Sequence, residues 1–357
     1  MSVQQNSQFK ILTINTFHIQ NSQFNTLNSA LTNTHTYIIP ISMNIVITDG
    51  FTLHSNDLAW DCFKSLGKVT FYERTPISNI VERCKEADIV ITNKTPFSAE
   101  TITALPQLKM IAVAATGYNI IETQATIAKG IIVSNIPAYG TASVAQHIFA
   151  LILELSNHVG KNSQAVANGA WVSARDWCFS LSPIIELAGK TLGIVGMGRI
   201  GQQTAKIAEA FGMKICYASR TVKEDLPYSA INIEKLFSES DFIALCCPST
   251  PENIGFVNKE LLAKMKRTAY LVNASRGQLI QEKDLAEALK EGVLAGAALD
   301  VLSQEPPSES NPLLTAPNCL ITPHNAWISF EARQRIVEML MANIKGFING
   351  TPQNVVK

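Results

Sequence analysis

Short runs of apolar residues alternate along the chain with longer segments in which apolar residues recur every three or four positions. From Ile45 to Asn135 the runs predicted as strands are IVITDG, VTFY, ADIVITN, KMIAVAATG and GIIVSN. The segments DLAWDCFKSLG, SNIVERCKEA and ETQATIAKG between them have helical spacing. This alternation predicts βαβ units that share a parallel sheet.

A second series of the same kind begins at Thr191. Its predicted strands are TLGIVGM, KICYAS, DFIALCC, AYLVNAS, LAGAALDV and CLITPH. Its predicted helices are RIGQQTAKIAEAFG, IEKLFSES, NKELLAKMK and EKDLAEALKEG, followed by a last helix, EARQRIVEMLMANIKGFING, that ends at Gly350. The fold class expected from both series is α/β, with two parallel-sheet domains.

The segment between the two series, residues 143–169, has the pattern of one long helix. Ser143 and Gln146 have the spacing of a capping box, which predicts that the helix begins there. The apolar side chains that follow recur on one wide face, as in a core helix or a helix that bridges two domains.

The first 42 residues have a different composition from the rest of the chain. They are rich in Asn, Gln, Ser and Thr and contain no acidic residue and no arginine. A transit peptide would be rich in arginine, so we expect residues 1–42 to be a disordered tail or the product of an upstream start codon. The first strand is then expected to begin at Met43 and Asn44.

Composition limits the classes of partner. The chain has 357 residues, 46% of them hydrophobic, which is enough for two domains with buried cores. Its 29 basic and 29 acidic residues balance, so neither a nucleic acid nor a membrane partner is expected. No apolar stretch approaches the roughly 20 residues that cross a bilayer. Seven scattered cysteines without CxxC spacing or a secretory leader predict a cytoplasmic protein. The histidines have no metal-ligand spacing, so no metal site is predicted.

The turn Gly196-Met197-Gly198-Arg199-Ile200-Gly201 follows a predicted strand and opens a predicted helix. In a dinucleotide fold the first glycine allows the tight turn, the second lets the backbone approach a pyrophosphate, and the third allows close helix packing. The N-terminus of the helix then favours the anion. Because strand, turn, helix and second strand occur in order, the sequence predicts a dinucleotide site.

The second strand of this unit ends in ICYASRT, with Ser219 about where NAD-binding units carry an acid. A carboxylate there would bind the 2′-hydroxyl of NAD and repel the 2′-phosphate of NADP. Ser219 does not repel the phosphate, and Arg220 can pair with it. This favours NADP over NAD, although Arg220 stacked on adenine would leave NAD possible.

Three further motifs place candidate chemistry at the carboxyl ends of strands, where open α/β sheets bind ligands. They are Arg276 in NASRGQLI, Asp300 and Glu305 in ALDVLSQEPP, and His324 in ITPHNAW. Each alone could be an ordinary surface or turn residue. Together in one nucleotide-binding unit they are typical of hydride transfer coupled to proton transfer.

These motifs as a set resemble the D-isomer-specific 2-hydroxyacid dehydrogenase family, from about Met43 to the C-terminus. Within it, ITNKTPF, ATGYN, IPAYGTASVAQH, DWCF, ELAGKTLGIVG and PQNVV resemble the glycerate dehydrogenase (hydroxypyruvate reductase) branch. The resemblance implies that NAD(P)H reduces hydroxypyruvate to D-glycerate: Arg276 orients the keto acid, His324 donates the proton, and Glu305 holds His324. A reductase of glyoxylate or another small 2-keto acid, or an NAD(P)H-sensing protein on the same fold, stays open as an alternative.

The resemblance also implies the remaining contacts. Substrate contacts are expected from Asn93, Lys94, Thr116, Gly117, Arg276 and His324. Cofactor contacts are expected from Thr116, Gly196, Gly198, Arg199, Ile200, Gly201, Ser219, Arg220, Cys247, Pro248, Asn273, Ala274, Ser275, Asp300 and His324, with Asp300 holding the nicotinamide carboxamide.

The implied architecture has two Rossmann-like or flavodoxin-like parallel-sheet domains. Residues 43–141 plus 328–357 would form the substrate domain and 142–327 the NAD(P)-binding Rossmann domain, with an active-site cleft between them. A homodimer built around the helix after Ser143 is expected. Two positions depart from the family pattern: Asn325, where an apolar residue is common, and Ser219, where NAD-dependent relatives carry Asp.

Overall fold

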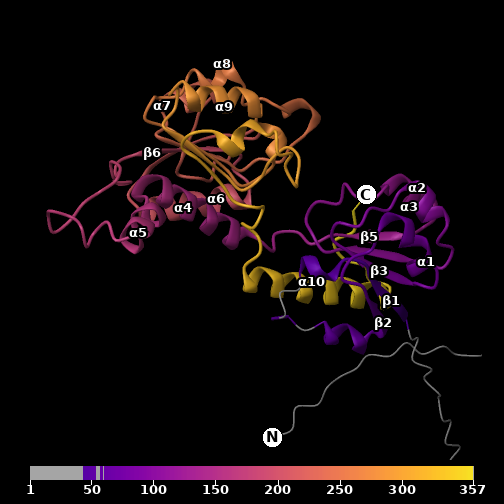
Figure 1. Ribbon diagram of the computed structural model, residues 1–357. Helices are drawn as coiled ribbons and strands as arrows, with labels where there is room; N and C mark the ends of the chain where they lie inside the picture. The colour runs from indigo at the N-terminus through magenta and orange to yellow at the C-terminus, as the bar shows by residue number, and fades with distance from the viewer. Residues whose placement is uncertain (1–42, 54–56, 59, 357) are drawn as a thin grey trace, which may run out of the picture. The chain divides into compact units, whose positions relative to one another are not determined.

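The computed structural model describes residues 43–53, 57–58 and 60–356, which form two compact units (Figure 1). The first unit contains the described residues up to Pro137 and those from Ile336 onward, and the second is Ala138–Arg335. The predicted domain boundaries, 141/142 and 327/328, lie near these divisions. Residues 1–42, for which a disordered or artefactual tail is predicted, lie outside the described residues.

The first unit is built on a five-stranded parallel sheet with the order β2-β1-β3-β4-β5, the flavodoxin-like order. The strands are β1 (Met43–Ile47), β2 (Gly67–Phe71), β3 (Ile89–Thr92), β4 (Met110–Val113) and β5 (Ile132–Ser134). The helices are α1 (Ile80–Cys84), α2 (Ala99–Thr103), α3 (Thr123–Ala128) and the larger part of α10 (Phe330–Ile348). Within the segment DLAWDCFKSLG, for which a helix is predicted, the described residues Asp61–Ser65 form a short 3-10 helix, and β2 begins two residues later.

The second unit is built on a seven-stranded parallel sheet with the order β12-β11-β10-β9-β6-β7-β8. The strands are β6 (Thr191–Val195), β7 (Lys214–Ala218), β8 (Ser229–Ala230), β9 (Phe242–Leu245), β10 (Tyr270–Asn273), β11 (Gly296–Leu299) and β12 (Cys319–Ile321). The strand order reverses between β6 and β9, as in a Rossmann fold, and ligands bind at the carboxyl edge near such a reversal. The prediction of two parallel-sheet α/β domains is confirmed.

Helices cover both faces of the second sheet (Figure 1). On one face lie α4 (Thr141–Asn157) and α6 (Arg199–Ala210), and on the other α7 (Ile233–Glu239), α8 (Lys259–Leu262) and α9 (Glu282–Lys290). Side chains of β9 alternate between the two cores: Phe242 and Ala244 pack with α4 and α6, whereas Ile243 and Leu245 pack with the other three helices. The central strands are therefore buried on both sides, which keeps their carboxyl ends in fixed positions.

The long helix predicted for residues 143–169 is two helices, α4 and α5 (Val159–Ala167). His158 lies between them with a left-handed φ of 51°, which ends α4. The predicted capping box at Ser143 is wrong, because α4 begins at Thr141 with Gly140 as its N-cap. The hydroxyl of Ser143 instead donates a hydrogen bond to the carbonyl of Ala326, at 2.6 Å.

Candidate active site

The glycine turn joins β6 to α6 at the reversal of the second sheet. Gly196 has a φ of +100°, and a Cβ built on it would lie 2.7 Å from the backbone nitrogen of Cys247, so glycine is required there. A Cβ built on Gly198 would meet no protein atom within 4 Å. α6 begins at Arg199 without a side-chain cap or an acidic residue in its first turn. These features suit a dinucleotide pyrophosphate, because the first N–H groups of α6 can bind an anion that approaches Gly198.

Ser219 and Arg220 follow β7 at the same edge of the sheet and are exposed. The N–H of Gly196 donates to the carbonyl of Ala218 at 2.8 Å, which brings the end of β7 beside the glycine turn. The charge of Arg220 also acts at Cys247, although burial dominates there and raises the pKa of the thiol. The site therefore has an exposed guanidinium and an exposed hydroxyl where a ribose would be read, and a thiol that stays protonated.

The predicted contacts on β9 and β10 lie at this edge as well. Cys247 and Pro248 follow β9, and Asn273 is the last residue of β10. The buried Asn273 side chain shapes the turn after it: its Nδ2 donates to the carbonyl of Arg276 at 2.9 Å, and its Oδ1 accepts from the backbone and hydroxyl of Ser275. Its observed task is thus to hold the turn that presents Arg276.

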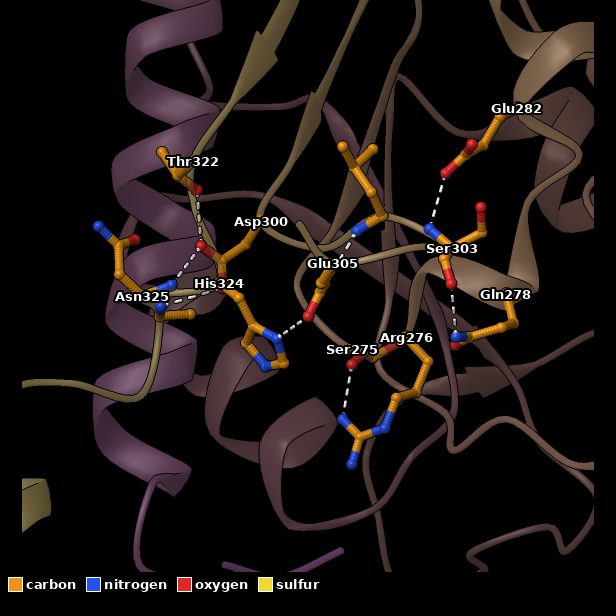
Figure 2. A network of polar contacts seen from close by, with 12 residues as sticks. Ser275, Arg276, Gln278, Glu282, Asp300, Ser303, Glu305, Thr322, His324 and Asn325 are labelled. Atoms are coloured by element: carbon orange, nitrogen blue, oxygen red, sulfur yellow. Dashed lines mark hydrogen bonds and ion pairs between the residues drawn. The ribbon is translucent and has the colours of Figure 1, made fainter. Parts of the chain in front are cut away.

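Arg276 is exposed, and its Nη1 donates to the carbonyl of Ser275 at 2.7 Å (Figure 2). A Cβ built on the next residue, Gly277, would lie 1.9 Å from the carbonyl carbon of Leu302. The Arg276 turn therefore packs directly on the backbone of the loop that contains Glu305. The amide of Gln278 reinforces this contact by donating to the carbonyl of Ser303 at 3.0 Å.

Glu305 and His324 form a hydrogen-bonded pair, with 2.6 Å between Glu305 Oε2 and His324 Nδ1 (Figure 2). The other carboxylate oxygen of Glu305 accepts the N–H of Leu302 at 3.1 Å. The side chains are 37% and 32% exposed. Since Nδ1 is engaged, Nε2 is the ring nitrogen left to exchange a proton with a substrate.

Asp300 lies directly after β11 and is 1% exposed. Its carboxylate accepts the hydroxyl of Thr322 at 2.6 Å and the N–H groups of Asn325 and Ala326 at 2.9 and 3.0 Å. Burial would raise the pKa of Asp300, but hydrogen bonds from His147, Thr322 and these two N–H groups outweigh it and hold the pKa below its ordinary value. The observed task of Asp300 is to fix the turn that carries His324, and its contact with the nicotinamide carboxamide stays a prediction.

The sequence reasoning missed Glu282, the first residue of α9. Its two carboxylate oxygens accept the N–H of Ser303 at 2.7 Å and the amide of Asn311 at 2.9 Å, so it anchors the loop around Glu305 (Figure 2). An acid in the first turn of a helix is common for electrostatic reasons, so nothing in the sequence marks this one as part of the site.

The predicted substrate residues Asn93, Lys94, Thr116 and Gly117 belong to the first unit. The N–H groups of Asn93, Lys94 and Thr95 all donate to the buried carboxylate of Asp49, another residue that the sequence reasoning missed. The turn therefore exposes Lys94. Thr116 is exposed, but its hydroxyl already donates to the carbonyl of Ile136 at 2.8 Å.

Asn325, a departure from the family pattern, follows His324 directly. Its side-chain oxygen is buried and has no hydrogen-bond partner among the residues that the structure describes.

Across residues 43–53, 57–58 and 60–356, no group of His, Cys, Asp and Glu is arranged to hold a metal ion. No helix formed by the described residues is long and apolar enough to cross a membrane.

Comparison with known proteins gives one consistent family. Residues 149–326 match the family model described as D-isomer specific 2-hydroxyacid dehydrogenase, NAD binding domain. The chain is 46% identical over 322 residues to a hydroxypyruvate reductase of Blautia hydrogenotrophica, a match that covers 88% of this chain and 99% of that protein. It is 41% identical over 280 residues to a glycerate dehydrogenase of Methylorubrum extorquens, covering 78% of this chain and 88% of that one.

Among solved structures, an NADPH-dependent glyoxylate/hydroxypyruvate reductase of Sinorhizobium meliloti, in complex with citrate, aligns with a TM-score of 0.77. The sequence identity is 27%, and the alignment covers 88% of this chain and 97% of that one. The likeness therefore extends over both units and is not restricted to the nucleotide-binding one.

Proposed function

Because the chain belongs to the D-isomer-specific 2-hydroxyacid dehydrogenase family, we propose that it reduces hydroxypyruvate to D-glycerate with a reduced nicotinamide cofactor, reversibly. The observation that carries this proposal is the 2.6 Å pair of Glu305 and His324, at the same sheet edge as the exposed Arg276. The names of the two curated relatives, a hydroxypyruvate reductase and a glycerate dehydrogenase, support the choice of substrate.

Arg276 is the residue assigned to orient the keto acid. One of its terminal nitrogens is bound to the carbonyl of Ser275, which leaves the remaining guanidinium N–H groups to face a ligand. A guanidinium can donate two parallel hydrogen bonds to a carboxylate and the adjacent keto oxygen, and its charge polarises the carbonyl. Holding both groups in one plane positions the carbonyl carbon for attack.

His324 is the residue assigned to move the proton. In the reductive direction its imidazolium donates from Nε2 to the carbonyl oxygen as that oxygen gains charge, and in the oxidative direction the neutral ring accepts the proton. Glu305 holds Nδ1 and carries the charge opposite to the imidazolium, so it keeps the ring orientation through both steps.

The cofactor assigned to the glycine turn is NADP rather than NAD, on the basis of Ser219 and Arg220. When bound, a reduced nicotinamide supplies the hydride that the carbonyl carbon accepts. The exposed Arg220 can pair with a 2′-phosphate, and its neighbours Ser219 and Thr221 carry no charge that would repel the phosphate. The NADPH dependence in the name of the Sinorhizobium meliloti protein supports this assignment. The other cofactor contacts that the resemblance implies, which are scattered along the chain between Thr116 and His324, are part of the same proposal.

We assign residues 43–141 with 328–357 to substrate binding and residues 142–327 to cofactor binding. In the first of these, the turn of Asn93 and Lys94 is the candidate for contacting the substrate carboxylate. Its backbone is held by Asp49, which leaves the cationic Lys94 side chain exposed. The Thr116-Gly117 turn is the second candidate, through its backbone N–H groups.

A homodimer is the proposed assembly, with a second copy of this chain covering the arm between α5 and β6. Figure 1 shows this segment extending away from the rest of the second unit. It exposes the large apolar side chains Trp171, Val172, Trp177, Leu181 and Ile184, and Trp177 is 86% exposed. Apolar area of this kind is characteristic of an interface between subunits. All seven cysteines are free thiols, which supports a cytoplasmic location.

The test is a set of initial rates with hydroxypyruvate, glyoxylate and phosphohydroxypyruvate, each with NADPH and with NADH. We expect kcat/KM to be highest for hydroxypyruvate with NADPH. A higher value for glyoxylate would favour the second candidate, which the name of the Sinorhizobium meliloti protein also supports. Binding of NADPH without oxidation by any 2-keto acid would contradict the enzyme proposal and favour a sensing role.

A further inference from the structure

His147, in the second turn of α4, lies against the carboxylate that fixes the catalytic turn. Its Nε2 is 3.1 Å from the hydroxyl oxygen of Thr322 and 3.4 Å from Asp300 Oδ1. The hydroxyl of Thr322 is in turn 2.6 Å from Asp300 Oδ1. Three side chains from three segments, α4, the end of β11 and the end of β12, thus meet at one buried oxygen.

The hydrogen-bond donors in this group can be assigned from valence alone. An ionised carboxylate only accepts, so the single hydroxyl proton of Thr322 is used in the short bond to Asp300. The hydroxyl oxygen must then accept from His147, which places a proton on Nε2. The result is a series of hydrogen bonds in which His147 donates to Thr322 and Thr322 donates to Asp300.

This series of hydrogen bonds supports an unfavourable backbone conformation at His324. That residue has a left-handed φ of 51°, a conformation that is unfavourable for a non-glycine residue. The N–H groups of the two residues after it, Asn325 and Ala326, donate to the two oxygens of Asp300, and its own N–H donates to the carbonyl of Asp300 at 2.8 Å. Movement of the Asp300 carboxylate would release the turn and, with it, the direction of the His324 ring.

We propose that His147 is a positioning residue for the reduction: it fixes the Asp300 carboxylate and thereby the turn that presents His324. This inference rests on the proposed function. His147 does not touch the reacting atoms, because its Nε2 is engaged by Thr322 and Asp300. Its contribution is to keep the proton donor in one orientation, which matters because a displacement of about 1 Å at a reacting group can lower a rate by about 100-fold.

The kinetic test compares His147→Ala and His147→Gln with Gln146→Ala as the matched control. Gln146 is the exposed neighbour on α4. We expect His147→Ala to lower kcat about 10- to 100-fold, with KM for hydroxypyruvate and the dissociation constant of NADPH within about threefold. His147→Gln, which retains a donor at similar reach, should recover most of the loss, and the control should match the wild type. Equal loss in the Ala and Gln variants, or a loss confined to KM, would overturn the proposal.

A second readout needs no turnover. Hydrogen exchange of residues 322–327 in the protein without substrate should become faster in His147→Ala, because Asn325 and Ala326 lose a fixed acceptor, while exchange in β6 and β7 should not change. Unchanged exchange in residues 322–327 would contradict the proposal. If His147→Ala does not fold, His147→Leu, which fills the space of the ring but has no donor, is compared with His147→Gln in its place. If the wild type reduces no 2-keto acid, the proposed function fails, and the exchange result still decides whether His147 holds the turn.

Discussion

The two halves of the second sheet differ in how their functional residues are held. Near the ends of β10, β11 and β12, hydrogen bonds within the protein hold Arg276, Asp300, Glu305 and His324. At the ends of β6 and β7, Gly198, Ser219 and Arg220 are exposed. Within the described part of the chain, no hydrogen bond from the side chains of Ser219 and Arg220 is found. We therefore expect the proposed reaction to depend on preorganised side chains, and the proposed choice of cofactor to depend on residues whose partner is the ligand.

The largest effect is expected from removing His324, the proposed proton donor at the end of β12. His324→Ala should lower kcat by about 10²–10⁴-fold, the usual range for loss of a general acid–base residue. The dissociation constant of NADPH, measured by fluorescence titration, should stay within about threefold of the wild-type value. Near-normal turnover would remove His324 from the role assigned to it.

The second-largest effects are expected from a pair of glycine substitutions, one in each half of the second sheet. Gly277→Ala places a methyl group on the backbone of Leu302, so we expect the Tm to fall by roughly 3–10 °C and kcat to fall about 10- to 100-fold. Gly198→Ala meets no protein atom and should leave the Tm of the cofactor-free protein unchanged. It should instead weaken NADPH binding about tenfold or more, about 1.4 kcal/mol. Equal melting curves for the two variants would contradict the distinction.

A smaller effect is expected from a substitution of Ser219, the residue proposed to contact the ribose of the cofactor. Ser219→Asp introduces a charge that repels a 2′-phosphate and can bind a 2′-hydroxyl, so the ratio of kcat/KM for NADH to that for NADPH should rise about tenfold. The value of kcat with the preferred cofactor should change little, because the residues proposed to move the proton are unaltered. The matched control is Thr221→Asp two residues further on, which should shift the ratio less.

The smallest effect concerns stability against acid. The pKa of Asp300 is held below its ordinary value, so its charged form stabilises the folded state above about pH 4. That contribution is lost as the pH falls through the depressed pKa. Asp300→Asn should therefore lower the free energy of unfolding at neutral pH and reduce its dependence on pH below 4, measured by denaturant titration. A variant whose unfolding keeps the full acid dependence would show that other carboxylates cause it.

Sequence patterns predicted the site residues that belong to motifs of neighbouring residues along the chain. Strand-and-turn spacing identified the glycine turn at 196–201, and the carboxyl ends of the strands located Arg276 and His324. The supporting residues have no such local pattern, because they act across long separations: His147 reaches Thr322, 175 residues away, and Asp49 reaches Asn93, 44 residues away. The break at His158 was also missed, since the apolar spacing of α4 continues into α5.

The most direct test of the division between the two halves is the double variant His324→Ala with Ser219→Asp. Rates with NADH and NADPH would be compared with those of each single variant in single-turnover measurements. Sites without shared partners contribute additively, within about 0.5 kcal/mol. We predict that the double variant loses rate by the factor of His324→Ala alone and changes cofactor ratio by the factor of Ser219→Asp alone. A departure from additivity of more than about threefold would contradict the account, because it would mean that the two halves act as one unit.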